Sequence, residues 1–209
     1  MAYIVHPTCQ IPNLSEIYTQ VFGENYIGSF VEVGAFDGMT YSNTWGLANA
    51  GWEGLYLEAH PDFAAQCQMN HLLNRKVSTL SAACGSEKGL GALTIYGECS
   101  TMKLSKWNRE WGMNDDTPKI VVDVVTLDHI LNDAITNIDL LVIDVEEMEI
   151  EVLKGFTLER YRPRMAIIEL HEGQGTRIDQ KGWQTPWVDN YFKGYNKIYS
   201  DNINTIFCL

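Results

Sequence analysis

Basic side chains are scarce in this chain of 209 residues, which has 15 lysines and arginines against 27 aspartates and glutamates and a formal net charge of −12. Nucleic-acid binding needs a basic stripe that neutralises phosphates, so we expect no nucleic-acid partner. No apolar run approaches the roughly 18 residues that a membrane helix needs, so we expect no membrane span. The sequence carries no indication of an oligomeric state.

Paired cysteines are also missing. The five cysteines are widely spaced and include no C-x-x-C pair, which predicts neither a zinc site nor a disulfide framework. Free thiols are typical of a reducing compartment. The N-terminus shows no basic segment followed by an apolar core, so no signal peptide is visible. We therefore expect a cytoplasmic protein.

Strand and helix patterns alternate along the chain without a repeat or a long linker, which predicts a single α/β domain over residues 1–209. Residues 1–28 form an N-terminal extension with a helix over 14–22. The nearly all-apolar segment 138–144 is typical of a parallel strand buried on both faces. The expected elements are strands 29–35, 54–59, 77–83, 92–96, 120–125, 138–144 and 165–170, helices 42–50, 62–73, 127–131, 147–156 and 188–195, and a closing hairpin of 197–199 with 205–208.

The most informative segment is the glycine-rich turn after the first strand. Glu32, Gly34, Asp37 and Gly38 follow an apolar run, and glycine lets a ligand approach the backbone closely. The spacing differs from the G-x-G-x-x-G of dinucleotide folds, and an acid inside the turn would repel a pyrophosphate. It suits a ligand with an amino group and a sulfonium, such as S-adenosylmethionine (SAM). A tight turn without a ligand is the alternative.

Acids follow several predicted strands at the same edge of the sheet. Glu58 ends the second strand, where an acid can accept both hydroxyls of a ribose. Asp144 and Glu146 follow the strand over 138–144, and Glu169 and His171 end the next one. Any one of them alone is compatible with a solvated loop. Ligands of such sheets bind beyond the carboxyl ends of the strands, so together these acids predict a nucleoside site there.

Three segments, residues 31–58, 124–128 and 138–163, resemble the FkbM-type methyltransferases in content and in order. The resemblance implies the class I SAM-dependent methyltransferase fold, a Rossmann-like, doubly wound and mostly parallel sheet with a closing antiparallel hairpin. It also implies methylation of a hydroxyl on a saccharide or another small hydroxylated natural product. The expected partner is accordingly a small-molecule or glycan acceptor.

The same resemblance implies roles for individual residues by matching position. Glu58 would hold the ribose hydroxyls of SAM, Ala59 would lie near the adenine, and the segment with Ala83 would flank the base. Ser42 is implied to cap the helix after the turn, to contact the ligand, or both. Five residues would surround the methionine part of SAM: Glu32, Gly34, Ala35, Asp37 and Gly38.

A hydroxyl acceptor must lose its proton, so a base or a metal ion is expected beside it. Asp144, Glu146 and His171 are the candidate catalytic residues. Desolvation at the end of a buried strand would raise the pKa of Asp144, while His171 is either a base that titrates near neutrality or an ordinary loop histidine. Asp144, Glu169 and His171 are alternatively ligands for a divalent metal such as Mg²⁺.

Two further features leave alternatives open. The polar, tryptophan-bearing segment 98–118 is either a substrate lid or a packed excursion of the chain. Glu147 stands where the family has glycine; it would be strained if the position needs a positive φ and favourable if a helix begins there, and we expect the helix.

Three functions compete. The leading one is a SAM-dependent O-methyltransferase. Glu147 motivates the alternative, a SAM-binding protein of the same fold without transfer activity. An NAD-dependent oxidoreductase is disfavoured by the acid in the glycine-rich turn and by the closing hairpin.

Overall fold

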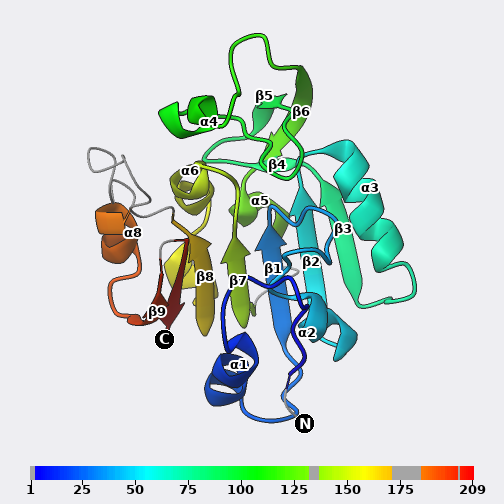
Figure 1. Cartoon of the computed structure of the whole chain (residues 1–209). Helices are drawn as coiled ribbons and strands as arrows, with labels where there is room; N and C mark the ends of the chain where they lie inside the picture. The colour runs from blue at the N-terminus through cyan, green and yellow to red at the C-terminus, as the bar shows by residue number, and fades with distance from the viewer. Residues whose placement is uncertain (1–2, 132–136, 171–184, 202) are drawn as a thin grey trace.

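A computed structural model describes residues 3–131, 137–170, 185–201 and 203–209. A seven-stranded sheet forms the body of the molecule (Figure 1). Its strands are β1 (Ser29–Val33), β2 (Glu53–Glu58), β3 (Val77–Ser81), β7 (Leu140–Ile143), β8 (Met165–Glu169), β9 (Asn196–Ser200) and β10 (Asn204–Cys208). Their order is β3-β2-β1-β7-β8-β10-β9. The first five run parallel, and β10 is antiparallel to both of its neighbours. The predicted parallel sheet and its closing hairpin are therefore confirmed.

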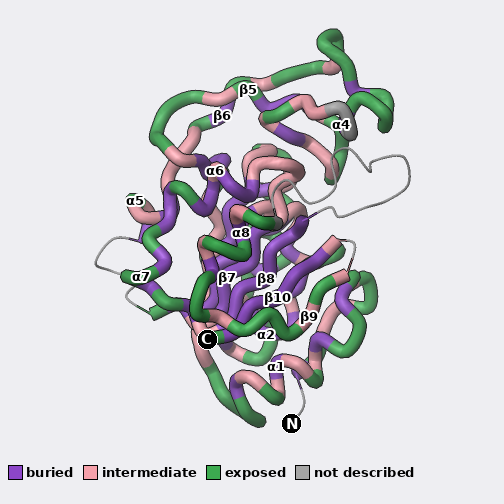
Figure 2. Tube along the Cα trace, turned by 90° about the vertical axis from the view of Figure 1, so that its left-hand side faces the viewer, coloured by how far each residue is buried: buried purple, intermediate pink, exposed green. Residues whose placement is uncertain are grey.

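Helices cover both faces of this sheet, and the apolar strands serve two cores. Leu140 and Val142 of β7 belong to the cluster on the face of α1 (Leu14–Phe22) and α2 (Trp45–Asn49). Leu141 and Ile143 belong to the cluster on the face of α5 (Leu127–Leu131) and α6 (Glu149–Lys154). This alternation is why the strand is apolar throughout and buried along its length (Figure 2). The helices are α1 (Leu14–Phe22), α2 (Trp45–Asn49), α3 (Pro61–Asn70), α5 (Leu127–Leu131), α6 (Glu149–Lys154), α7 (Leu158–Tyr161) and α8 (Thr185–Tyr191).

A small second sheet stands above the carboxyl ends of the parallel strands (Figure 1). It consists of β4 (Ala83–Cys84), β5 (Gly89–Thr94) and β6 (Lys119–Val125) in the order β4-β6-β5, and α4 (Lys106–Glu110) follows β5. The sequence predicts one strand over 77–83, but β3 ends at Ser81 and Ala83 already pairs with β6. The chain thus leaves the main sheet at the edge where ligands bind in this architecture.

Other boundaries differ less from the prediction. The helix expected over 188–195 is α8, which begins at Thr185, and the sequence pattern does not predict α7 at all. All five cysteines have free thiols, as their spacing predicts. Among the described residues, no helix combines the length and the apolarity that a membrane crossing requires.

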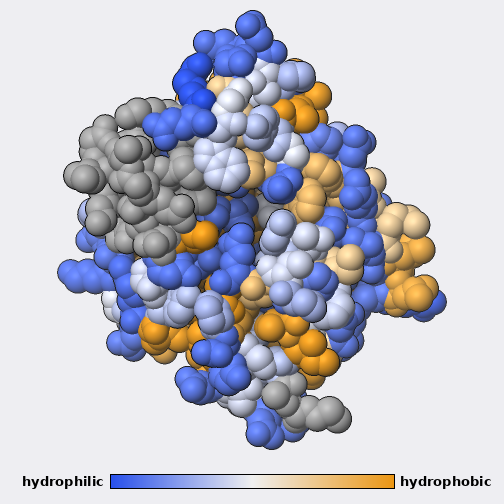
Figure 3. Space-filling model, in the orientation of Figure 1, coloured by the Kyte–Doolittle hydropathy of each residue, from blue (hydrophilic) through white to orange (hydrophobic). Residues whose placement is uncertain are grey.

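One group of exposed apolar side chains lies at the end of α3. Met69, Leu72 and Leu73 are 65%, 62% and 95% exposed where α3 leads towards β3. Figure 3 shows apolar side chains at the right edge of the molecule in this region.

Candidate functional site

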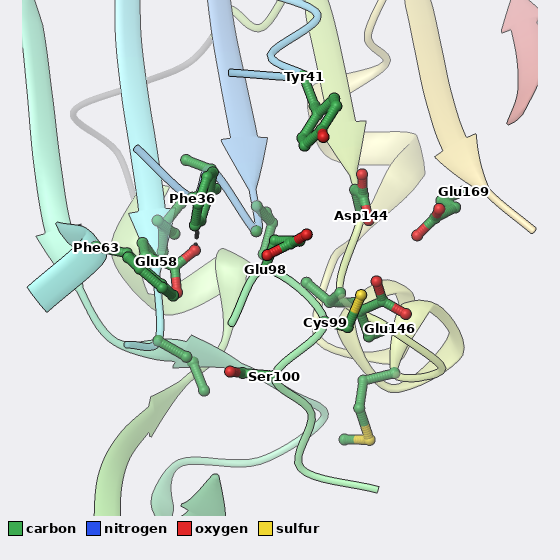
Figure 4. Close-up of a pocket in the computed structure, with 18 of the residues that line it drawn as sticks. Phe36, Tyr41, Glu58, Phe63, Glu98, Cys99, Ser100, Asp144, Glu146 and Glu169 are labelled. Carbon is green, nitrogen blue, oxygen red and sulfur yellow. Dashed lines mark hydrogen bonds between the residues drawn. The ribbon is translucent and has the colours of Figure 1, made fainter. Parts of the chain in front are cut away.

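A cavity of about 420 Å³ lies at the carboxyl ends of β1, β2 and β7, beneath the second sheet. Gly34, Glu58 and Asp144 line it from the main sheet, and Leu93 lines it from β5. Figure 4 shows the side chains that project into it, with Glu58 on one side and Asp144, Glu146 and Glu169 on the other. The cavity therefore lies at the edge of the sheet where the sequence predicts a nucleoside site.

Glu32 lies on the cavity wall, but the chain already uses its carboxylate. It is 3% exposed and accepts hydrogen bonds from Ser42 Oγ at 3.0 Å, Asn43 N at 3.2 Å and Thr44 Oγ1 at 2.5 Å. Burial raises the pKa of Glu32 to about 7, against the opposing effect of these donors. Ser42 Oγ in turn accepts the Trp45 N–H at 3.1 Å and so supports the start of α2. Glu32 therefore holds the segment after the turn in place.

The glycine-rich turn is shaped by contacts within the chain. Gly34 has a φ of +83°, and a Cβ there would lie 1.6 Å from the Asp144 carbonyl oxygen. A Cβ on Gly38 would lie 2.5 Å from Cys67 Sγ. Asp37 accepts hydrogen bonds from Met39 N at 2.9 Å and from the next backbone N–H. Asp37 and Gly38 do not line the cavity; they form the turn that brings Gly34 and Ala35 to it.

Glu58 has the geometry of a hydroxyl acceptor. It is 9% exposed; one carboxylate oxygen accepts the Phe36 N–H at 2.8 Å and the other the His60 N–H at 2.7 Å. Burial raises the pKa of Glu58 to about 7, against the opposing effect of these bonds. The two oxygens of a carboxylate have about four acceptor sites in all, so Glu58 can still accept a further donor beside these backbone groups. Two neighbouring hydroxyls match this arrangement.

Apolar groups flank Glu58. The rings of Phe36 and Phe63 meet edge to face with centroids 4.5 Å apart, and Ala59 and Ala83 also line the cavity. These walls suit a planar aromatic base. Sequence reasoning missed Phe63, although its place in the first turn of the helix after the β2 tip is a signal that could have found it.

Three carboxyl groups gather opposite Glu58. One oxygen from each of Asp144, Glu146 and Glu169 lies within 4.8 Å of the others. Glu169 is 5% exposed, and burial, followed by the charge of Asp144 and a hydrogen bond with it, raises its pKa well above the usual range. The hydrogen bond with Glu169 also helps to position Asp144. Carboxylates in this arrangement can accept a proton or surround a cation.

The loop after β7 corrects the expectation for Glu147. The helix α6 begins only at Glu149, and Glu146 and Glu147 have positive φ values of 54° and 82°. The Glu149 carboxylate accepts the N–H groups of Val145 and Glu147 at 3.4 and 3.1 Å, and Thr101 Oγ1 donates to the Glu146 carbonyl at 2.7 Å. The prediction of a first helical turn at Glu147 was wrong because these bonds hold a left-handed loop.

Most of the predicted site residues meet at the cavity. His171 lies outside the described residues, so its catalytic and metal-binding roles stay predictions. Sequence reasoning missed Gln10 and Tyr41, which line the cavity from the N-terminal segment and from the residues before α2; no sequence motif indicates them. The predicted residues on the lining are Glu32, Gly34, Ala35, Ser42, Glu58, Ala59, Ala83, Asp144, Glu146 and Glu169.

Comparison with solved structures identifies the fold. An FkbM methyltransferase from Methylobacillus flagellatus KT aligns with a TM-score of 0.55 and 13% identity over 100% of this chain and 48% of its own. A putative caffeoyl-CoA O-methyltransferase from Staphylococcus aureus aligns with a TM-score of 0.54 and 13% identity over 97% and 85%. An O-methyltransferase from Bacillus cereus in complex with S-adenosylhomocysteine (SAH) aligns with a TM-score of 0.53 and 15% identity over 98% and 84%. The chain has the class I SAM-dependent methyltransferase fold and spans about half the length of the M. flagellatus protein.

Comparison of the sequence with family profiles identifies the family of this chain. The profile described as the methyltransferase FkbM domain matches residues 32–199. This chain belongs to the FkbM methyltransferase family. A search of curated proteins gave no significant match.

Proposed function

We propose that this chain binds SAM and transfers its methyl group to a hydroxyl of a saccharide or another small hydroxylated acceptor. The observation that carries the proposal is the position of Glu58. Its carboxylate is fixed by two backbone N–H groups at one end of a cavity whose other end holds Asp144. Membership of the family supports the reaction class, and the SAH bound to the B. cereus O-methyltransferase supports the cofactor.

The described residues fit SAM in three parts. The remaining acceptor capacity of Glu58 suits the two ribose hydroxyls. The apolar lining residues Phe36, Phe63, Ala59 and Ala83 suit contact with the adenine. The wall formed by Glu32, Gly34, Ala35 and Ser42 suits the methionine part. When bound, SAM supplies an electrophilic methyl group on a sulfonium, and its transfer leaves SAH.

The acid pair opposite Glu58 supplies the base. Burial and the charge of Asp144 raise the pKa of Glu169 well above its usual range, and the hydrogen bond between the two side chains positions Asp144. Asp144 then accepts the proton of the acceptor hydroxyl as the oxygen bonds to the methyl carbon. Glu146 lies within reach of the same proton. Transfer also requires the cavity to align the acceptor oxygen with the methyl carbon.

A second candidate function rests on Glu147. Its φ of 82° is costly for a residue with a Cβ, and the family has glycine at this position. A protein that keeps the cofactor pocket but has lost transfer is consistent with that replacement.

Calorimetric titration with SAH tests the cofactor assignment. We expect wild-type protein to bind SAH and Glu58→Gln to bind it about 5- to 150-fold more weakly, since a lost bond in a buried site costs roughly 1–3 kcal/mol. Glu53→Gln is the matched control, because Glu53 is exposed at the opposite end of the same strand. Equal SAH affinity in the two variants, or binding of NAD in place of SAH, would reject the proposal.

Methyl transfer from labelled SAM to a panel of methyl glycosides and natural-product alcohols tests the reaction. Label that appears in a methyl ether of one of the acceptors supports the proposed O-methyltransferase. Tight binding of SAH without label on any acceptor, with or without Mg²⁺, favours the second candidate.

A further inference from the structure

Part of the cavity wall comes from the N-terminal segment of the chain. Gln10 lines the cavity together with Tyr41 and Ser42, which precede α2. In Figure 1 this segment, in dark blue, runs across the face of the sheet beside α2 before the chain enters α1. Gln10 lies outside residues 32–199, which the family profile matches. Its place on the wall is therefore a feature of this chain that the family match does not explain.

Two hydrogen bonds fix the N-terminal segment on the residues before α2. Thr8 Oγ1 accepts the Tyr41 N–H at 2.7 Å, and Cys9 Sγ donates to Asn43 Oδ1 at 3.5 Å. Gln10 directly follows Cys9 in the chain. Its position is accordingly set by the same stretch of chain that forms the proposed methionine wall.

Packing against α2 holds the segment further. A Cβ on Gly46 would lie 1.6 Å from the Ile4 carbonyl oxygen, so the two backbones are in direct contact. The His6 ring meets the Trp45 ring edge to face, with centroids 5.1 Å apart. These contacts hold the segment that ends at Gln10 against the sheet, so the chain presents Gln10 to the cavity from a fixed backbone.

The methionine part of SAM carries a carboxylate as well as an ammonium. A carboxylate that leaves water needs hydrogen-bond donors in place of its hydration. None of the described residues that line the cavity is lysine, arginine or histidine. Within the described part of the wall, neutral donors therefore have to take this role.

Few neutral donors remain on the wall. Three hydroxyls of the lining already donate to other groups of the chain: Thr40 to Asp37 at 2.8 Å, Ser42 to Glu32 at 3.0 Å and Ser100 to the Gly97 carbonyl at 2.7 Å. Beside the N-terminal segment, the described donors that remain are the Gln10 amide and the Tyr41 hydroxyl (Figure 4). Gln10 is exposed and Tyr41 is 44% exposed, so a ligand can reach both.

We propose that the Gln10 amide, together with the Tyr41 hydroxyl, binds the carboxylate of the methionine part of SAM. Thr8 is a positioning residue, because its hydroxyl fixes the backbone of Tyr41. This inference rests on the proposed function and adds two residues to the cofactor site. It assigns recognition of the carboxylate to neutral hydrogen bonds and not to an ion pair.

Three ligands that share adenine and ribose test the inference by calorimetry. They are SAH, its decarboxylated analogue, which keeps the amino group, and methylthioadenosine, which lacks the whole amino-acid part. Gln10→Glu keeps the length of the side chain but places negative oxygens against the carboxylate of SAH. We expect this variant to bind SAH about tenfold or more weakly than wild type, and to bind neither analogue more weakly.

Further variants separate the individual roles. Gln20→Glu is the matched control, because Gln20 is an exposed residue of α1 outside the cavity lining, and it should leave all three affinities unchanged. Tyr41→Phe should weaken SAH several-fold and leave both analogues unchanged. Thr8→Val should act like Tyr41→Phe, whereas Thr8→Ser, which keeps the hydroxyl, should restore SAH binding.

The outcomes distinguish this inference from the proposed function. Failure of wild-type protein to bind SAH rejects both. If wild type binds SAH, equal SAH affinity in Gln10→Glu and Gln20→Glu overturns only the present inference. An equal loss of SAH and of both analogues in Gln10→Glu also overturns it, because the variant would then disturb the whole pocket. Equal SAH affinity in Thr8→Val and wild type rejects the positioning role of Thr8.

Discussion

The two ends of the cavity are built in different ways. At the Glu58 end, the carboxylate is held by the N–H of Phe36, 22 residues away, at the tips of two adjacent parallel strands. At the other end, Asp144 and Glu169 come from neighbouring strands, and Glu98 comes from the segment between β5 and β6. The first end depends on contacts between the tips of two neighbouring strands, whereas the second also depends on the segment between β5 and β6.

Asp144→Asn should give the largest effect and separate the ends most clearly. Loss of the base should lower turnover about 10²- to 10⁴-fold, while SAH affinity changes little because Glu58 is untouched. Methyl-transfer assays measure the turnover, and calorimetric titration of the same preparation measures the SAH affinity. A greater loss of turnover in Glu146→Gln than in Asp144→Asn would instead make Glu146 the base.

The pH dependence of stability should sharpen the comparison at the Glu58 end. Because burial raises the folded-state pKa of Glu58 from 4.5 to about 7, the native state binds more protons than the unfolded state between these values. The stabilisation from Glu58 is therefore complete below pH 4.5 and is lost as the pH rises through 7. Its contribution to the free energy of unfolding is at most about 3 kcal/mol. Urea unfolding should show that the free energy of unfolding falls less between pH 5 and pH 8 in Glu58→Gln than in wild type. An equal fall of the free energy of unfolding in the two proteins would show that burial does not raise the pKa of Glu58.

The same group should make cofactor binding respond to pH in the opposite direction. Ribose hydroxyls donate best to an ionised carboxylate, so SAH affinity should rise as the pH increases through 7 and should not do so in Glu58→Gln.

Glu147→Gly, in the loop after β7 at the Asp144 end of the cavity, should change the stability of the protein only slightly. A left-handed φ costs a residue with a Cβ roughly 1–2 kcal/mol, and the greater unfolded-state entropy of glycine offsets 0.4–1 kcal/mol of that. We expect a net stabilisation of about 1 kcal/mol or less by urea unfolding, with SAH affinity unchanged. Glu147→Ala is the control, because alanine keeps the Cβ and should not raise the free energy of unfolding. A destabilised Glu147→Gly would show that the glutamate side chain supports the loop.

Local patterns predict much of the main sheet and the Glu58 end. The alternation of apolar strands with helices, the acid at the β2 tip and the hairpin β9–β10 are each encoded within a few neighbouring residues, because strand and helix periodicities are local. The split between β3 and β4 at Ala82 is not predictable in this way. The stretch 77–83 remains extended throughout, and only its pairing partners change.

Which acids meet in space depends on long-range packing. Asp37 lies in the same motif as Gly34, yet its carboxylate completes the turn and does not face the cavity. Tyr41 reaches the cavity through a bond to Thr8, 33 residues earlier in the chain. Sequence spacing indicates which residues end a strand, but it does not indicate where their side chains point.

The sequence by itself determined that five strands run parallel and that several end in acids at one edge, because burial on both faces requires apolar strands and leaves polar groups at their tips. Only the tertiary structure decided that Glu98 joins Asp144 and Glu146 at one cavity, and that Glu147 occupies a left-handed loop. Those outcomes depend on contacts between segments far apart in the chain, such as the bond from Thr101 to the Glu146 carbonyl.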